Sequence, residues 1–159
     1  MFGIGIAVAA AIVIIALCAG AISVIAAVRG AQHRADDARQ ALRLRQAACL
    51  ELEQRLNRLT PPGATTTSPA RAAAVQSENA AVRIYVGETR DQRSQDGWRQ
   101  LLDARTAYAE ALLGQAKTRT PAFYVAPRTS DGGALTDELA EWSPASCAGV
   151  IHRLAAPDL

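Results

Sequence analysis

The chain has 159 residues, and its 17 Lys and Arg against 15 Asp and Glu give a net charge of +2. This length allows one ordinary domain at most. The nearly even charge balance excludes a strongly basic nucleic-acid binder, and only three cysteines exclude a disulfide-dense secreted scaffold. We therefore expect no nucleic-acid partner.

The N-terminal part is an uncharged apolar run over residues 2–28. As a helix it would be about 40 Å long, against about 30 Å for the hydrocarbon core of a bilayer. The run predicts a single transmembrane helix whose first partner is the lipid bilayer. A cleaved signal peptide is disfavoured because no basic residue precedes Arg29, and lipidation is disfavoured because Cys18 closes only an imperfect lipobox.

Small residues recur at helical spacing within this run. A smooth face of small residues is typical of close helix–helix contact in membranes. The pattern predicts packing against other membrane-protein subunits through Ala16, Gly20, Ser23 and Ala27.

The predicted membrane exit is rich in arginine. Five lie within 17 residues of it: Arg29, Arg34, Arg39, Arg43 and Arg45. The positive-inside rule places such a cluster in the cytoplasm, and we expect Arg29, Arg34 and Arg39 to contact lipid headgroups. Together with an Arg- and Ala-rich composition, this predicts a bacterial inner (cytoplasmic) membrane protein with a cytoplasmic C-terminal region. An exported stalk could carry the same arginines.

Residues 29–59 carry a heptad pattern, which predicts a stalk helix that continues the membrane helix. Its a and d positions are Ala35, Ala38, Leu42, Arg45, Cys49, Leu52, Leu56 and Leu59. In a parallel dimer Arg34 would face Arg39, so the flanking charges do not favour a homodimer, although a homo-oligomer stays possible. We interpret Cys49 as a small buried residue, with a bridge between two chains possible in an oxidising compartment.

A Pro/Thr-rich linker at residues 60–69 precedes a mainly helical second arm at 70–118. Residues 82–86 alternate like a strand, but no second strand is evident, so we predict helix there. An apolar stripe on this arm includes Trp98, Leu101, Tyr108 and Leu112. Together with Leu42, Cys49, Leu52, Leu56 and Leu59, these residues form the predicted helix–helix interface. We expect an antiparallel hairpin of 33–59 against part of 70–117.

Residues 119–159 predict an irregular tail with short helices, one from Thr136 to Trp142 and another from Ser143 to Leu154. Beyond residue 28, Leu, Ile, Val and Phe make up only 22 of 131 residues. A fraction this low argues against a large self-sufficient core. We expect the apolar tail residues to dock on a partner. The predicted fold class is therefore mainly α: a single transmembrane helix, a helical stalk, a helical hairpin and an irregular tail.

No pattern in the sequence points to catalysis. The two histidines, His33 and His152, are far apart, and Cys147 with His152 lacks an orienting third group. We expect no enzyme activity, no cofactor and no metal. The favoured function is a non-catalytic accessory or scaffold subunit of a bacterial membrane complex. The alternative is a phage lysis protein, because the chain resembles inner-membrane spanins in layout: an anchor, a helical stalk and a similar length. Such spanins place the stalk in the periplasm, but this chain lacks their basic N-terminus.

Overall fold

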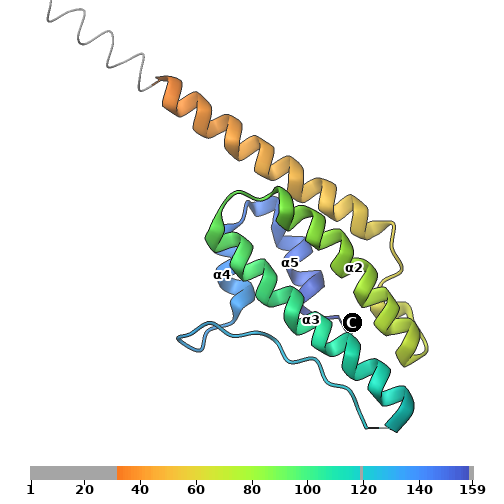
Figure 1. Cartoon of the computed structure of the whole chain (residues 1–159). Helices are drawn as coiled ribbons and strands as arrows, with labels where there is room; N and C mark the ends of the chain where they lie inside the picture. Colours follow the sequence, from red (N-terminus) through yellow and green to blue (C-terminus); the bar gives the residue numbers. More distant parts are fainter. Residues whose placement is uncertain (1–31, 119, 158–159) are drawn as a thin grey trace, which may run out of the picture. The chain divides into compact units, whose positions relative to one another are not determined.

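The computed structural model describes residues 32–118 and 120–157, and the chain divides into two units at residues 42 and 43. The predicted membrane helix and its packing residues, together with Arg29, lie outside the described residues. Within the described part, no helix combines the length and the apolar character that crossing a bilayer requires. The described structure is mainly helical (Figure 1), which confirms the predicted fold class at that level.

The described part of the first unit, residues 32–42, is helical and exposed throughout. Asp36 accepts a hydrogen bond from Arg39 at 3.0 Å, one turn along this helix. Arg34 and Leu42 are both exposed, and Leu42 keeps 48% of its surface accessible. The N-terminal part of the heptad pattern therefore has no partner among the described residues of this unit.

The second unit begins with helical residues that continue to residue 57. A short 3-10 helix, η1 (Pro62–Ala64), leads to α2 (Ser68–Glu88) and α3 (Gln92–Thr118). An extended segment follows, in which Arg128 and Ala134 form an isolated antiparallel bridge. The chain ends in α4 (Leu135–Trp142), η2 (Ala145–Cys147) and α5 (Ala148–Ala155). Both predicted tail helices are present, and each begins within a few residues of its predicted start.

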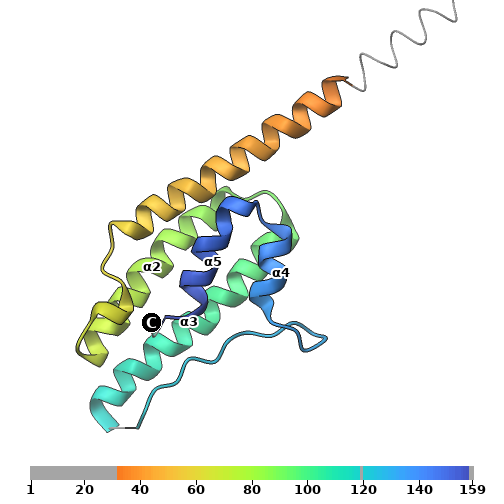
Figure 2. The ribbon, with the colours of Figure 1, turned by 180° about the vertical axis from the view of Figure 1, so that it is seen from behind.

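The second arm, predicted as mainly helical, consists of two helices, α2 and α3. α2 and α3 lie side by side as an antiparallel hairpin in both views (Figures 1 and 2). The reversal is fixed by capping: Thr89 donates its hydroxyl to the carbonyl of Tyr85 at 3.0 Å, and Asp91 accepts the N–H of Ser94 at 2.8 Å. The hairpin is thus formed within residues 68–118, and residues 43–57 pack on it through Cys49, Leu52 and Leu56. Residues 82–86 are helical, as predicted.

Buried apolar side chains form two clusters. The main cluster joins residues 43–57, α2, α3, α4 and α5, and consists of Cys49, Leu52, Leu56, Val82, Tyr85, Val86, Trp98, Leu101, Leu102, Leu135, Leu139, Cys147, Val150, Ile151 and Leu154. The small cluster joins α2 and α3 alone, through Ala72, Val75, Tyr108, Ala109 and Leu112.

This core is larger than the composition indicates. A count of Leu, Ile, Val and Phe omits the cysteines, alanines and aromatic residues that contribute to both clusters. The tail expectation also needs correction, because Leu139, Val150 and Ile151 complete the chain's own main cluster. The sequence did not indicate this packing, because the other residues of the main cluster lie in segments far upstream of the tail.

Candidate functional site: a disulfide and a buried polar layer

A disulfide joins the first helical segment to the C-terminal end of the chain. Cys49 and Cys147 are bonded across 98 residues of sequence, with their Cα atoms 5.1 Å apart, a separation that ordinary disulfides share. Both residues are fully buried in the main cluster. The partner of Cys49 is therefore a cysteine of the same chain and not a second copy.

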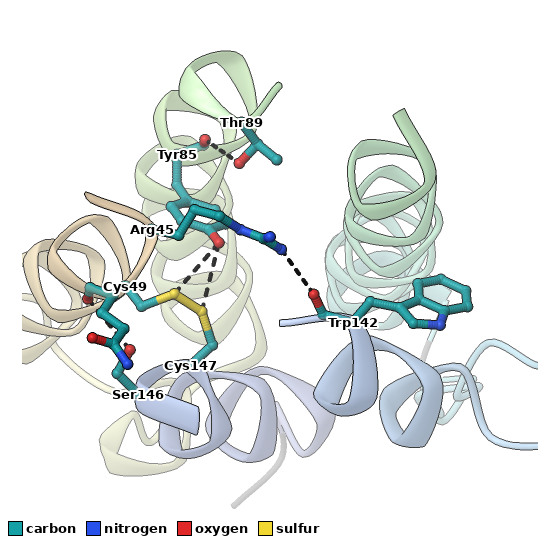
Figure 3. The surroundings of a disulfide bond; sticks show 8 residues. Arg45, Cys49, Tyr85, Thr89, Trp142, Ser146 and Cys147 are labelled. Atoms are coloured by element: carbon teal, nitrogen blue, oxygen red, sulfur yellow. Dashed lines mark hydrogen bonds between the residues drawn. A yellow bond between two sulfur atoms is a disulfide. The ribbon is translucent and has the colours of Figure 1, made fainter. Parts of the chain in front are cut away.

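The hydroxyl of Tyr85 contacts both sulfur atoms of the disulfide (Figure 3). Its hydroxyl lies 3.4 Å from Sγ of Cys49 and 3.5 Å from Sγ of Cys147, and it must be the donor because a disulfide carries no hydrogen. Burial raises the pKa of the Tyr85 phenol, while a hydrogen bond with Thr89 and the charge of Arg45 oppose this shift. The phenol is consequently held in its neutral, hydrogen-bonding form.

Two further contacts connect the same segments. Arg45 donates from Nη2 to the carbonyl oxygen of Trp142 at 3.0 Å, and Ser146 donates its hydroxyl to the carbonyl of Gln46 at 3.3 Å (Figure 3). Arg45, an a/d position in the heptad pattern, thus satisfies the last carbonyl of α4. The disulfide is the covalent member of a set of contacts between residues 45–49 and 142–147.

A second group of side chains forms a polar layer, defined here as Glu78, Asn79, Arg105 and Arg153. Arg105 is fully buried and pairs through Nη2 with Glu78 Oε2. Its Nε donates to Asn79 Oδ1 at 2.8 Å, and its Nη1 donates to the carbonyl of Leu154 at 2.6 Å. Burial lowers the pKa of Arg105, and the neighbouring Glu78 carboxylate opposes that shift.

Arg153 extends the layer to the surface. It donates from Nε to Glu78 Oε1 at 2.9 Å and from Nη2 to the carbonyl of Leu56 at 2.9 Å. A further bond reaches Asn57 Oδ1 at 3.0 Å. The two arginines therefore satisfy carbonyl groups near the C-terminal ends of two helices, where such groups lack partners within the helix.

The polar layer lies between the two apolar clusters. On α2, Glu78 and Asn79 fall between Val75 of the small cluster and Val82 of the main cluster. On α3, Arg105 falls between the corresponding residues of the two clusters. Each side-chain nitrogen of Arg105 and each carboxylate oxygen of Glu78 has a hydrogen-bond partner, so removal of either residue would leave a buried charge uncompensated.

An open cleft of about 470 Å³ is bounded by α3, α4 and the turn at residues 129–131. The Arg93 guanidinium covers the ring of Trp142 at 3.9 Å and lies 4.0 Å from the Glu138 carboxylate. The lining has no cysteine or histidine, and its hydroxyl and carboxylate groups include the exposed pair in which Thr129 donates to Asp131 Oδ1. Over the described residues, no group of three His, Cys, Asp or Glu side chains could hold a metal ion.

The structure brings most of the predicted interface residues together and separates one. Cys49, Leu52, Leu56, Trp98 and Leu101 meet in the main cluster, and Leu59 packs against its edge. Tyr108 and Leu112 belong to the small cluster, whereas Leu42 is exposed. Arg34 and Arg39, the described headgroup candidates, are both exposed.

Two features were missed from the sequence. The polar layer carried a usable signal, because Arg105 interrupts the apolar stripe of α3 at a position between Leu101 and Tyr108 where a core residue is expected. The Cys49–Cys147 bond carried none, since three cysteines and no spacing rule leave the pairing open.

Comparison with protein-family models, with curated proteins and with solved structures gives no match to this chain. Its function must therefore be argued from the geometry described above.

Proposed function

We propose that this chain is a non-catalytic single-pass membrane protein whose helical domain lies on the extracytoplasmic side and acts as an accessory or scaffold subunit. The observation that carries this proposal is the buried Cys49–Cys147 disulfide. Structural disulfides form and persist in oxidising compartments and are rare in the cytoplasm, where thiols are kept reduced.

The disulfide favours the opposite side of the membrane from the arginine cluster. The positive-inside rule is a bias in orientation, and stalks that are exported can still carry basic residues. The buried disulfide joins cysteines that are 98 residues apart and so constrains most of the second unit. We therefore give it the greater weight and place the C-terminal domain in the periplasm of a bacterial cell.

The accessory role follows from what the domain offers chemically. Its most buried charged groups, Glu78 and Arg105, pair with each other and connect α2 with α3. Its cleft is lined by neither cysteine nor histidine. What remains available is surface, which suits a protein that acts through contacts with other membrane subunits.

A spanin-like lysis protein is the second candidate, because the disulfide also suits its periplasmic placement. The compactness of the second unit favours the first candidate. Of the predicted stalk at 29–59, residues 29–48 lie N-terminal to the disulfide, and from Cys49 onward the apolar heptad positions pack into the chain's own core.

The test uses the full-length chain with a reporter fused after Leu159. We expect activity from a reporter that works only in the periplasm and none from one that works only in the cytoplasm. As a control on the cause, thiol alkylation in a strain without its periplasmic thiol oxidase should reach Cys49 and Cys147. Cytoplasmic reporter activity would overturn the proposed placement.

Membrane anchoring through residues 2–28 has its own test. The full-length protein should stay in the membrane pellet after alkaline carbonate extraction, because a spanning helix resists it. Release into the supernatant would contradict the anchor. Loss of host lysis on deletion, with lysis restored by re-expression, would favour the spanin-like candidate over the accessory subunit.

A further inference from the structure

The segment after α3 is an extended chain with two different faces. Tyr124 packs its ring against Tyr108, with centroids 5.8 Å apart, and Ala122 also contacts the small cluster. Phe123 and Val125 point the other way and keep 75% and 76% of their surface exposed. In both views the segment runs as an open ribbon past α3 (Figures 1 and 2). Alternate residues of this segment therefore face opposite ways, as in a β-strand, and among the described residues no second strand pairs with it.

The two edges of this strand also differ. Ala122 donates its N–H to Gln115 Oε1 at 3.2 Å, so one edge is engaged by α3. Across the described residues, no hydrogen bond reaches the backbone groups of Phe123 or Val125. In an extended chain the N–H and C=O groups of these two residues point to the same edge. Unpaired edges of this kind, with apolar side chains beside them, are templates for another strand.

The sequence of the strand is nearly symmetric about its centre. It reads Pro121, Ala122, Phe123, Tyr124, Val125, Ala126, Pro127. If two copies pair in antiparallel fashion about Tyr124, Phe123 of each lies opposite Val125 of the other. An aromatic residue opposite a β-branched one is a favourable cross-strand pair. The free edge would then form four hydrogen bonds, two from each Phe123–Val125 pair.

We propose that this edge is a homotypic docking site, and that its occupant is the same strand of a second copy of this chain. The contact is isologous, as a two-fold dimer requires, because each copy offers the same patch. Pro121 and Pro127 lack N–H donors, so they limit the ladder to residues 122–126. The opposite edge is engaged by Gln115 of α3, so pairing stops at two chains. This route to a dimer does not depend on the stalk helix, whose flanking charges do not favour a parallel pair.

The edge of residues 122–126 is small, so pairing requires a high local concentration of the chain. A strand of five residues between prolines buries far less than the roughly 800 Å² per partner of a stable interface. Residues 1–31 lie outside the described part and include the uncharged run at 2–28. If that run anchors the chain, copies share one membrane and the effective concentration rises enough for a small contact. In this respect alone the inference rests on the proposed function.

Cysteine cross-linking of the full-length protein in phospholipid vesicles tests the register. Phe123→Cys and Val125→Cys are prepared separately in a Cys18→Ser background, and the oxidised Cys49–Cys147 bond stays buried. We expect a mixture of the two variants to form an intermolecular disulfide under mild oxidation about five-fold more than either variant alone, because opposite Cβ atoms lie about 4.5–5.5 Å apart and diagonal neighbours about 7–8 Å. Equal cross-linking within a single variant, or none in the mixture, would overturn the pairing.

A matched pair of variants checks that the backbone edge is responsible. Ser77→Cys on the exposed face of α2 serves as a cross-linking control outside the strand. Adding Phe123→Pro to the Val125→Cys variant removes an N–H from the free edge and should lower its cross-link with Phe123→Cys several-fold, whereas Phe123→Leu at the same position should leave that cross-link largely unchanged.

Two other occupants would give different results. If the strand enters the bilayer, Phe123→Cys is protected from water-soluble maleimide by vesicles and the mixed cross-link is absent, which contradicts the proposal. If it binds a foreign peptide, the mixed cross-link is likewise absent from the purified protein. Carbonate extraction of the same vesicles reports on anchoring separately, so loss of the anchor and loss of the pairing are distinguished.

Discussion

The main cluster and the small cluster lie along the same two helices, α2 and α3, on either side of the polar layer. They differ in the residues and segments that cover them. The main cluster has large aliphatic side chains, Trp98 and a disulfide that ties in the C-terminal end of the chain. The small cluster has two alanines, Val75, Leu112 and Tyr108, and the extended segment packs against it through Ala122 and Tyr124. The segments that cover one end of the hairpin are therefore joined covalently to each other, whereas the small cluster is held by packing, so local opening is expected to begin at the small cluster.

The polar layer should matter to both clusters. We expect Glu78→Gln to lower the free energy of unfolding by about 3–5 kcal/mol, because it leaves the buried Arg105 guanidinium without a counter-charge. Urea denaturation of the full-length protein in detergent, followed by tryptophan fluorescence, measures this. Glu51→Gln is the matched control, since the Glu51–Arg55 pair is exposed and should change stability by less than about 1 kcal/mol. Equal effects from the two variants would show that the layer is not structural.

Removing the disulfide should affect the two ends of the hairpin unequally. For the double variant Cys49→Ala and Cys147→Ala we expect a loss of about 2–4 kcal/mol. Hydrogen exchange should speed up in residues 45–57 and in α5, while amides near Tyr108 and Leu112 change little until global unfolding. Cys18→Ala should leave both patterns as they are. Uniform loss of protection would mean that the two clusters are a single cooperative unit.

The two ends of α3 should respond in opposite ways to the same substitution. At Gly97 an added Cβ would lie 2.8 Å from Cδ2 of Leu139, so Gly97→Ala is expected to cost about 1–3 kcal/mol. At Gly114, toward the small cluster, nothing lies within 4 Å, and Gly114→Ala should stabilise by up to about 1 kcal/mol. Thermal unfolding of both variants measures the difference, and a shift in the same direction for both would contradict it.

Alkaline pH should weaken the main cluster through Tyr85. Burial raises the pKa of this phenol in the folded state, so the unfolded chain loses its proton first as the pH rises past the ordinary value of 10.0. Stability from this residue is therefore complete below pH 10 and declines above it, by at most about 0.8 kcal/mol at pH 10.5. Tyr85→Phe should flatten the dependence of the unfolding free energy on pH over this range. An unchanged slope would show that Tyr85 is not the titrating group.

The heptad pattern identified the face that packs in the second unit but not how far the contact extends. Cys49, Leu52 and Leu56 are buried, whereas Leu42, in the same register, is exposed. Periodicity reports which side of a helix is apolar, and it has no information about the length of the surface it meets. The reversal between α2 and α3 was missed for a related reason: it has no proline, and the stop comes from side-chain caps at Thr89 and Asp91.

The candidate site was less predictable than the fold. Arg105 and Glu78 are 27 residues apart on different helices, and only the antiparallel hairpin brings them together. Gly97 of α3 leaves room for Leu139 of α4, because an added Cβ there would lie 2.8 Å from Cδ2 of Leu139. Both depend on tertiary neighbours, which a single sequence does not specify without knowing how its helices pair.

The spacing of Cys49 and Cys147 also sets an order of events during biosynthesis. Ninety-eight positions separate the two cysteines, so at about 5–20 residues per second the first thiol is made roughly 5–20 s before the second. During that interval the residues around Cys49 lack their contacts with η2 and α5, which are synthesised later. The bond therefore reports that synthesis has passed η2, because no truncated product that ends before Cys147 can form it.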